Sequence, residues 1–154
     1  MATYRIERNL EASLIDQVTT LLSSGGWTGI SVVKSFTQAY ESFPSICINV
    51  VEPNFTRKEI GNYEFIKIYT INIRLFCEND GQRLDLADYL LGEIEKGFKY
   101  YEYVIENGLV SSKIQTGRIN INKMRESRKE LRNTENLTKE DKYRHIISFD
   151  VKIN

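Results

Sequence analysis

The clearest alternation of apolar and polar residues in the chain runs from Phe65 to Cys77. One face of this segment would carry Phe65, Tyr69, Ile71, Ile73, Leu75 and Cys77, and the other would carry Thr70, Asn72 and Arg74. A period of two is typical of a strand with one face in the core and one in solvent. We therefore predict a long strand over this range.

Apolar residues at steps of three and four predict two helices. The first would bury Ile6, Leu10, Leu14, Val18, Leu21 and Leu22 and would end at Ser23-Ser24-Gly25-Gly26. Paired glycines there accept the left-handed backbone that closes a helix. The second helix would run from Asp80, as its N-cap, to Tyr103, and would bury Leu84, Ala87, Leu90, Leu91, Ile94 and Phe98. The aromatic cluster at its far end, Phe98, Tyr100, Tyr101 and Tyr103, would finish the core or anchor a partner.

Four further segments have strand character: Ile30–Phe36, Ser45–Val51, Lys113–Asn122 and Tyr143–Ile153. The last alternates cleanly and would bury Phe149 among other apolar residues. A chain of 154 residues is ordinarily one domain that buries about two-thirds of its unfolded surface. We therefore predict a single α+β domain over residues 1–154, with a mainly antiparallel sheet of about five strands and two helices packed on one face.

Two polar segments interrupt this plan. The connector Glu52–Glu64 holds Phe55, Ile60 and Tyr63, which we predict as candidate subunit-interface residues because long connections often carry binding. The alternative is a solvated hairpin tip whose aromatic side chains fold back on their own domain.

The second segment is a charged excursion at about 123–142, which has too few apolar residues to bury much. It is either a solvated helix or a basic arm that contacts phosphates or an acidic rim. The candidate residues that would face a partner or DNA are Arg118, Arg125, Arg128, Lys129 and Arg132.

Composition narrows the function classes. The 21 basic and 21 acidic residues balance, which argues against a dedicated nucleic-acid binder with a broad basic face. Cys47 and Cys77 lie in apolar runs, as expected of reduced thiols in a cytoplasmic protein. No apolar run approaches the roughly 20 residues of a membrane span, so we predict a soluble protein without membrane contact.

No pattern in the sequence predicts catalysis or a cofactor. His145 is the single histidine and shares a strand register with Ile147 and Phe149, which favours a core or edge role. It cannot form a zinc site of typical spacing with the two cysteines. Asp80, Asp85 and Asp88 crowd the start of a helix, where they complement the helix dipole. We therefore predict that the protein is not an enzyme and needs no metal or cofactor.

The order of elements resembles that of the tail terminator and tail completion (neck) proteins of tailed bacteriophages. The resemblance rests on the first helix ending at Gly25-Gly26, the strand Pro44–Val51, the strand Phe65–Cys77 and the helix Asp80–Tyr103. It implies a homo-hexameric ring at the head-proximal end of the tail, which stops tail-tube growth and docks the head connector or head-closure protein. It also implies a place in the virion after assembly in the host cytoplasm, with DNA passing through the lumen without specific binding.

Two other functions fit the same sequence. One is a different phage neck or tube protein, such as a head-closure subunit. The other is a small nucleic-acid-binding protein that uses the basic 118–132 segment. If the connector is a ring interface, removing the side chains of Phe55 and Tyr63 should impair ring formation and leave the fold intact, whereas an unchanged oligomer would reject that role.

Overall fold

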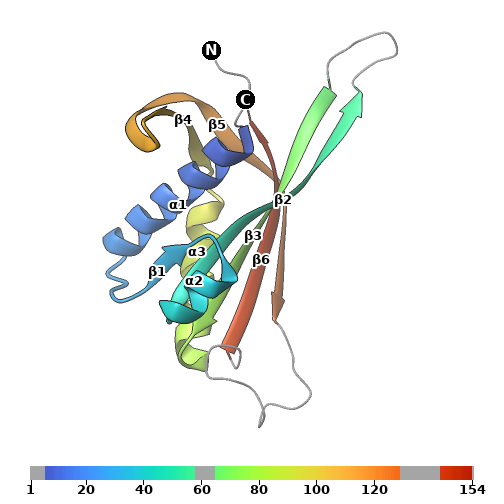
Figure 1. Cartoon of the computed structure of the whole chain (residues 1–154). Coiled ribbons are helices and arrows are strands. Elements are labelled where there is room, and N and C mark those ends of the chain that lie inside the picture. The colour runs from blue at the N-terminus through green and yellow to red at the C-terminus, as the bar shows by residue number, and fades with distance from the viewer. Residues whose placement is uncertain (1–5, 58–64, 129–142, 154) are drawn as a thin grey trace.

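The protein, seen here as a computed structural model, is described over residues 6–57, 65–128 and 143–153 (Figure 1). Its elements, in chain order, are α1 (Ile6–Ser24), β1 (Ser31–Val33), α2 (Phe36–Glu41), β2 (Ser45–Arg57), β3 (Phe65–Cys77), α3 (Asp80–Ile94), β4 (Phe98–Glu106), β5 (Leu109–Arg128) and β6 (Tyr143–Ile153). The predicted strands Phe65–Cys77 and Tyr143–Ile153 are confirmed over their full lengths.

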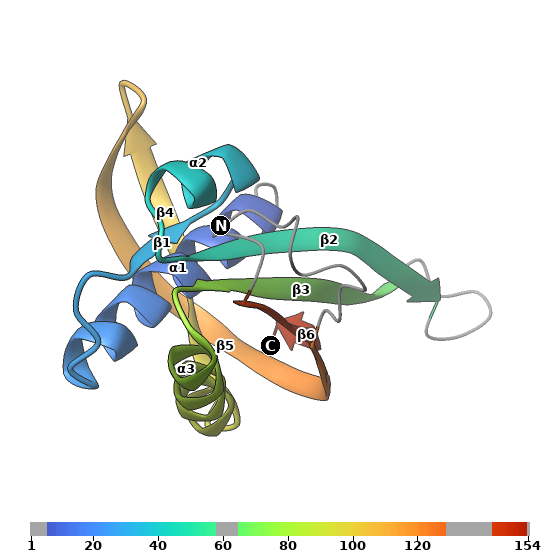
Figure 2. The same ribbon diagram turned by 90° about the horizontal axis from the view of Figure 1, so that it is seen from below.

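The strands form one sheet in the order β1-β2-β3-β6-β5-β4. β1 is parallel to β2, and every other neighbouring pair is antiparallel. The sheet curls into a half-barrel, so that β4 and β5 stand steeply to β2 and β3 (Figure 2).

The predicted fold class is therefore wrong. The described residues form a mixed sheet of six strands with three helices, not a mainly antiparallel sheet of about five strands with two helices. The added helix is α2, which lies where the predicted strand Ile30–Phe36 would end. The hydroxyl of Ser35 accepts a hydrogen bond from the backbone N–H of Gln38 and so caps α2.

The two faces of the sheet have different cores. α1 and α3 pack on the inner face, where Leu14 and Leu90 join the strand residues Ile73 and Phe149, all fully buried. α2 lies on the outer face and covers a small second cluster of Ala39, Cys47 and Phe76. The outer face thus has an apolar end under α2, and beyond that end it carries mainly polar residues, such as Asn72, Ser148 and Asp150.

α1 ends at the predicted glycines. Gly26 has a φ of +77°, and the N–H of Trp27 donates to the carbonyl of Leu22 at 2.9 Å. A left-handed glycine with this bond is a common helix stop. The ring of Tyr89 on α3 lies against Gly25, and its hydroxyl donates to the carbonyl of Leu21 at 2.6 Å, which ties the end of α1 to α3.

The second predicted helix is too long. Its N-cap is Asn79, whose side chain accepts from the N–H of Gln82 at 2.7 Å, and not Asp80. The helix stops at Ile94, and Gly97, with a φ of +78°, turns the chain into strand β4. The aromatic cluster that was expected on a helix therefore lies on a strand. Phe98 and Tyr100 are buried there, one on each side of exposed Lys99.

β4 is an edge strand, and polar side chains of α1 bond its backbone. Three residues one helical turn apart meet three alternate strand residues: Asn9, Ser13 and Gln17 bond Tyr103, Tyr101 and Lys99, respectively. Four helical residues rise about 6 Å and two strand residues about 6.7 Å, so the two spacings match. This α1–β4 ladder covers an edge that would otherwise offer free N–H and C=O groups to another strand.

Ser13 is the centre of the ladder and is fully buried. Its Oγ accepts from the N–H of Tyr101 at 3.0 Å and lies 3.4 Å from the carbonyl oxygen of the same residue, to which it donates. We expect Ser13→Ala to lower the free energy of unfolding by about 1–3 kcal/mol, because it leaves buried backbone groups without a partner. Urea denaturation would measure this change in the free energy of unfolding. Thr19→Ala is the control, since Thr19 is exposed and bonds only its own helix, and it should change stability by less than about 0.5 kcal/mol.

Candidate interaction surfaces

The β4–β5 hairpin projects beside α1 (Figure 1). Its two-residue turn is Asn107-Gly108, with φ values of 52° and 79°, and Glu106 pairs with Leu109 across it. Positive φ at both positions defines the turn type that matches strand twist, and Asn-Gly is its preferred sequence. The Asn107-Gly108 dipeptide was a sequence signal for this hairpin. The predicted helix from Asp80 to Tyr103 did not take that signal into account.

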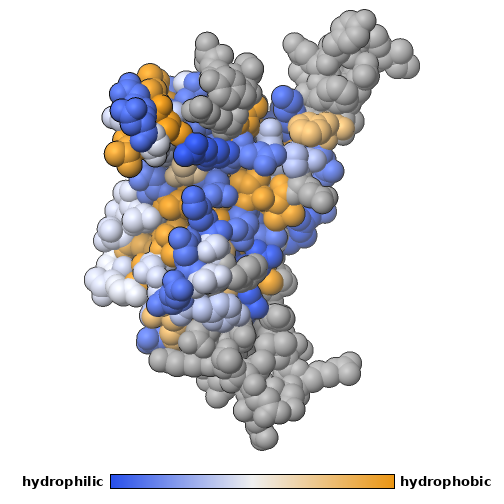
Figure 3. Space-filling view, in the orientation of Figure 1, coloured by the Kyte–Doolittle hydropathy of each residue, from blue (hydrophilic) through white to orange (hydrophobic). Residues whose placement is uncertain are grey.

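One face of the hairpin points away from α1 and carries three exposed apolar side chains among polar ones. Glu102 pairs with Ile114 and Glu106 with Leu109, and Val104 lies between the two glutamates on the same face of β4. Val104, Leu109 and Ile114 are 40%, 74% and 59% exposed. Figure 3 shows hydrophobic side chains gathered at this corner of the molecule. We call Val104, Leu109 and Ile114 the hairpin patch, and apolar groups exposed together in this way mark interaction sites.

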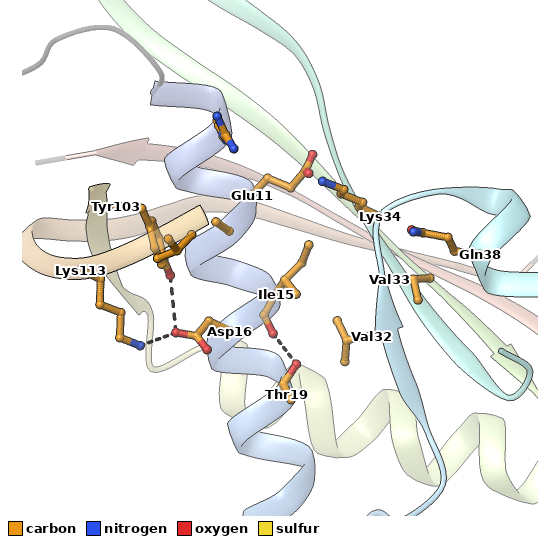
Figure 4. A pocket seen from close by; sticks show the side chains of 13 residues that line it. Glu11, Ile15, Asp16, Thr19, Val32, Val33, Lys34, Gln38, Tyr103 and Lys113 are labelled. Atoms are coloured by element: carbon orange, nitrogen blue, oxygen red, sulfur yellow. Dashed lines mark hydrogen bonds and ion pairs between the residues drawn. The ribbon is translucent and has the colours of Figure 1, made fainter. Parts of the chain in front are cut away.

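The other face of the hairpin forms one wall of a groove along the outer side of α1 (Figure 4). β1 and the start of α2 form the opposite wall. The groove encloses about 670 Å³, within the range of about 300–1,000 Å³ that binding pockets usually have. Its apolar lining is Ala12, Ile15, Val32, Val33 and Val110, and its charged lining is Arg8, Glu11, Asp16, Lys34 and Lys113. We call it the α1 groove.

The charges of the α1 groove are partly paired. Asp16 forms an ion pair with Lys113 and accepts a hydrogen bond from the hydroxyl of Tyr103 at 3.5 Å. The bond to Asp16 raises the pKa of Lys113, and burial raises the pKa of Tyr103. Burial also raises the pKa of Glu11, an effect that the nearby charge of Lys34 opposes.

A polar strip runs across the outer face of the sheet, on the side away from α1 and α3. Thr70 donates to Asp150 at 2.9 Å, and Arg125 lies 3.5 Å from the same carboxylate. The pairing register places five basic residues and one acidic residue on this outer sheet face: Arg74, Lys123, Arg125, Arg144, Lys152 and Asp150. It is a basic surface on a chain whose net charge is zero.

The structure places four of the eight residues predicted for the interface or for DNA. Phe55 lies on β2, is 54% exposed and pairs with Lys67. Arg118 is exposed on β5, and its guanidinium donates to the carbonyl of Lys96. Arg125 belongs to the outer sheet face, and the backbone of Arg128 pairs with His145 at the end of β5.

The remaining predicted residues, Ile60, Tyr63, Lys129 and Arg132, lie outside the described residues, as does the excursion from 129 onward. The part of the excursion that the structure does describe, 123–128, belongs to β5 and is not a solvated helix. The role of Phe55 and Tyr63 in a subunit interface stays a prediction.

A buried polar cluster lies at the start of α3. Arg83 is 1% exposed, and its guanidinium donates two hydrogen bonds to Asp80, at 3.0 and 2.5 Å. A third nitrogen of Arg83 lies 3.4 Å from Nδ1 of His145. Because arginine can only donate, Nδ1 is the acceptor in this contact. His145 is 4% exposed, so of the two predicted roles, core or edge, the structure shows the core one.

Sequence reasoning missed Arg83 and placed Leu84 in the core instead, although Leu84 is 49% exposed. The signal was available, because position 83 lies on the same helical face as Ala87, Leu90 and Ile94. Arginine is rarely buried unless it is paired, and here its charge is compensated by Asp80.

Both cysteines are free thiols and fully buried. Burial raises the pKa of Cys77 to about 12 and also raises that of Cys47. We expect neither thiol to react with iodoacetamide at pH 8 in the native protein, because the thiolate is the nucleophile. The pKa of Cys77 is higher folded than unfolded, so its contribution to stability should be lost as the pH rises from about 8.5 toward 12.

Mass spectrometry would count the adducts: none in the native protein and two after denaturation in guanidinium. Rapid modification of Cys77 in the native protein would contradict this burial.

Neither a family model nor a curated protein matches this chain. Within the described ranges, no group of three or more histidine, cysteine, aspartate or glutamate residues could hold a metal ion. The helices that the structure describes include none long and apolar enough to cross a membrane.

Proposed function

We propose that this protein is a structural subunit that assembles with copies of itself into a closed ring. The observation that carries the proposal is the hairpin patch, three apolar side chains held on a projecting hairpin. The α1–β4 ladder and the Asn107-Gly108 turn hold this hairpin in a defined position. Exposing these three apolar side chains together lowers the solubility of a monomer and does not stabilise its fold, so the patch is more easily explained as an interface.

The two surfaces beside the hairpin favour a ring over a two-fold dimer. The hairpin patch and the α1 groove lie on opposite faces of one hairpin, so they are different surfaces of the same molecule. Contacts between different surfaces are heterologous, and repeated heterologous contacts give a ring when the rotation closes.

The ring that the resemblance implies is the hexamer of a phage tail terminator. In this role the protein stops tail-tube growth at the head-proximal end and offers its other side to the head connector or head-closure protein. A net charge of zero suits a ring through which DNA passes, because strong phosphate contacts would hold the genome back.

Electron microscopy of particles made without this protein tests the proposal. We expect tails of uncontrolled, excessive length when the terminator is missing. Free tails of normal length would contradict the proposal and would indicate a head-closure subunit instead.

The outer sheet face favours one second candidate function, which is binding to a nucleic-acid backbone. Five basic residues against one acidic residue form a positive surface of the kind that contacts phosphates. Fluorescence anisotropy with duplex DNA would test it. Binding that weakens steeply with salt and is lost in Lys123→Glu/Arg125→Glu would support this function, and no binding at low salt would remove it. The control is Lys67→Glu, an exposed lysine on the opposite face of β3, which should leave binding unchanged.

A further inference from the structure

We infer that the hairpin patch of one copy occupies the α1 groove of the next copy. This inference rests on the proposed ring and names the contact that would build it. The occupant of the groove is a second copy of this chain. Its hairpin patch would contact the apolar lining of the α1 groove, between α1 and β1.

The hairpin patch cannot fill the groove of its own molecule. Tyr103, Val110 and Lys113 are the hairpin residues that line the groove, and they lie on the face toward α1. Val104 and Ile114 lie on the opposite face of the same two strands. The patch therefore points away from its own groove, and only another molecule can bring the two surfaces together.

The apolar parts of the two surfaces are complementary in kind. The patch presents three aliphatic side chains that alternate along two paired strands. The groove presents aliphatic side chains from both of its walls and its floor, namely Ala12, Ile15, Val32, Val33 and Val110. Its volume of 670 Å³ has room for several such side chains. Contact would remove both apolar surfaces from water, which is the main driving force for association.

The charged parts of the two surfaces are also complementary. Glu102 and Glu106 share the face of the hairpin patch and flank its apolar residues. Arg8 and Lys34 line the groove, and among the described residues neither forms an ion pair. Asp16, the acidic group nearer the hairpin wall, is already paired with Lys113. The groove lining holds three basic residues, Arg8, Lys34 and Lys113, against two acidic residues, Glu11 and Asp16. This excess of positive charge faces the two glutamates of the patch, which would favour one orientation of the contact.

Cross-linking between two different cysteine variants tests this contact. Leu109→Cys places a thiol on the hairpin patch, and Thr19→Cys places one on the exposed rim of the groove. The native cysteines are buried and give little background. A short bis-maleimide should join the two variants when they are mixed, and neither variant to itself. Leu84→Cys mixed with Thr19→Cys is the control, since Leu84 is an exposed leucine on α3.

A charge exchange gives an independent readout. Glu106→Lys should weaken self-association at least tenfold, and adding Lys34→Glu in the same chain should restore most of it. Light scattering on the same samples separates the possible failures. A ring that forms without the cross-link and ignores the charge exchange overturns this contact and leaves the ring proposal intact. A strict monomer that does not assemble with tail tubes overturns both.

Discussion

Phe149→Ala is expected to lower the free energy of unfolding by about 3–5 kcal/mol, the usual cost of truncating a packed phenylalanine. Phe149 is fully buried on β6, between Ile71 of β3 and Met124 of β5 in the pairing register. It therefore lies at the centre of the sheet, under the helices of the inner face. The site is closed on every side, so the structure cannot easily collapse into the space that the ring leaves.

Urea denaturation followed by circular dichroism would measure this loss. Ile146→Ala is the matched control, because Ile146 lies on the opposite face of the same strand and is only partly buried. It should cost clearly less than Phe149→Ala. Equal losses for the two variants would contradict the assignment of the inner face as the main core.

The second large effect is expected on assembly. Replacing Leu109 and Ile114 together with aspartate should abolish the ring and leave a folded monomer. Burying each side chain fully is worth about 1.5–3 kcal/mol, so losing both removes roughly 3–6 kcal/mol of association energy, or about 10²–10⁴ in affinity. The added charges would also be costly to bury.

Leu84→Asp is the control for this experiment, since it makes the same kind of substitution at an exposed leucine of α3, away from the hairpin. Its oligomer should match the unmodified protein in light scattering, and the thermal unfolding of both variants should stay close to the parent. A double aspartate variant that still forms the ring would show that the hairpin patch is not an interface.

Much of the fold was predictable where one period dominated the sequence. β3 and β6 alternate without conflict, and α1 carries a single apolar stripe and ends in two glycines, so their assignments are confirmed. Prediction failed where two patterns overlap. Phe98 continues the apolar stripe of helix α3, yet Phe98 and Tyr100 also alternate with Lys99 as in a strand. The helix ends before the turn at Gly97, so these residues form a strand.

The candidate surfaces were less predictable than the fold. The α1 groove joins residues of α1, β1, α2 and the β4–β5 hairpin, which only the tertiary structure brings together. The burial of Arg83 likewise depends on His145, which is far away in the sequence. Phe55 was predicted in a polar connector, whereas the structure places it, exposed, on strand β2, and its interface role stays a prediction.

The solution mass of the purified protein, measured by light scattering over a range of protein concentrations, tests the ring most directly. We predict one closed oligomer of defined mass, or a monomer that converts to that single mass when tail tubes are added. A strict monomer at every concentration, unchanged by tail tubes, would contradict the proposed ring. If that monomer bound DNA, the outer sheet face would become the principal functional surface.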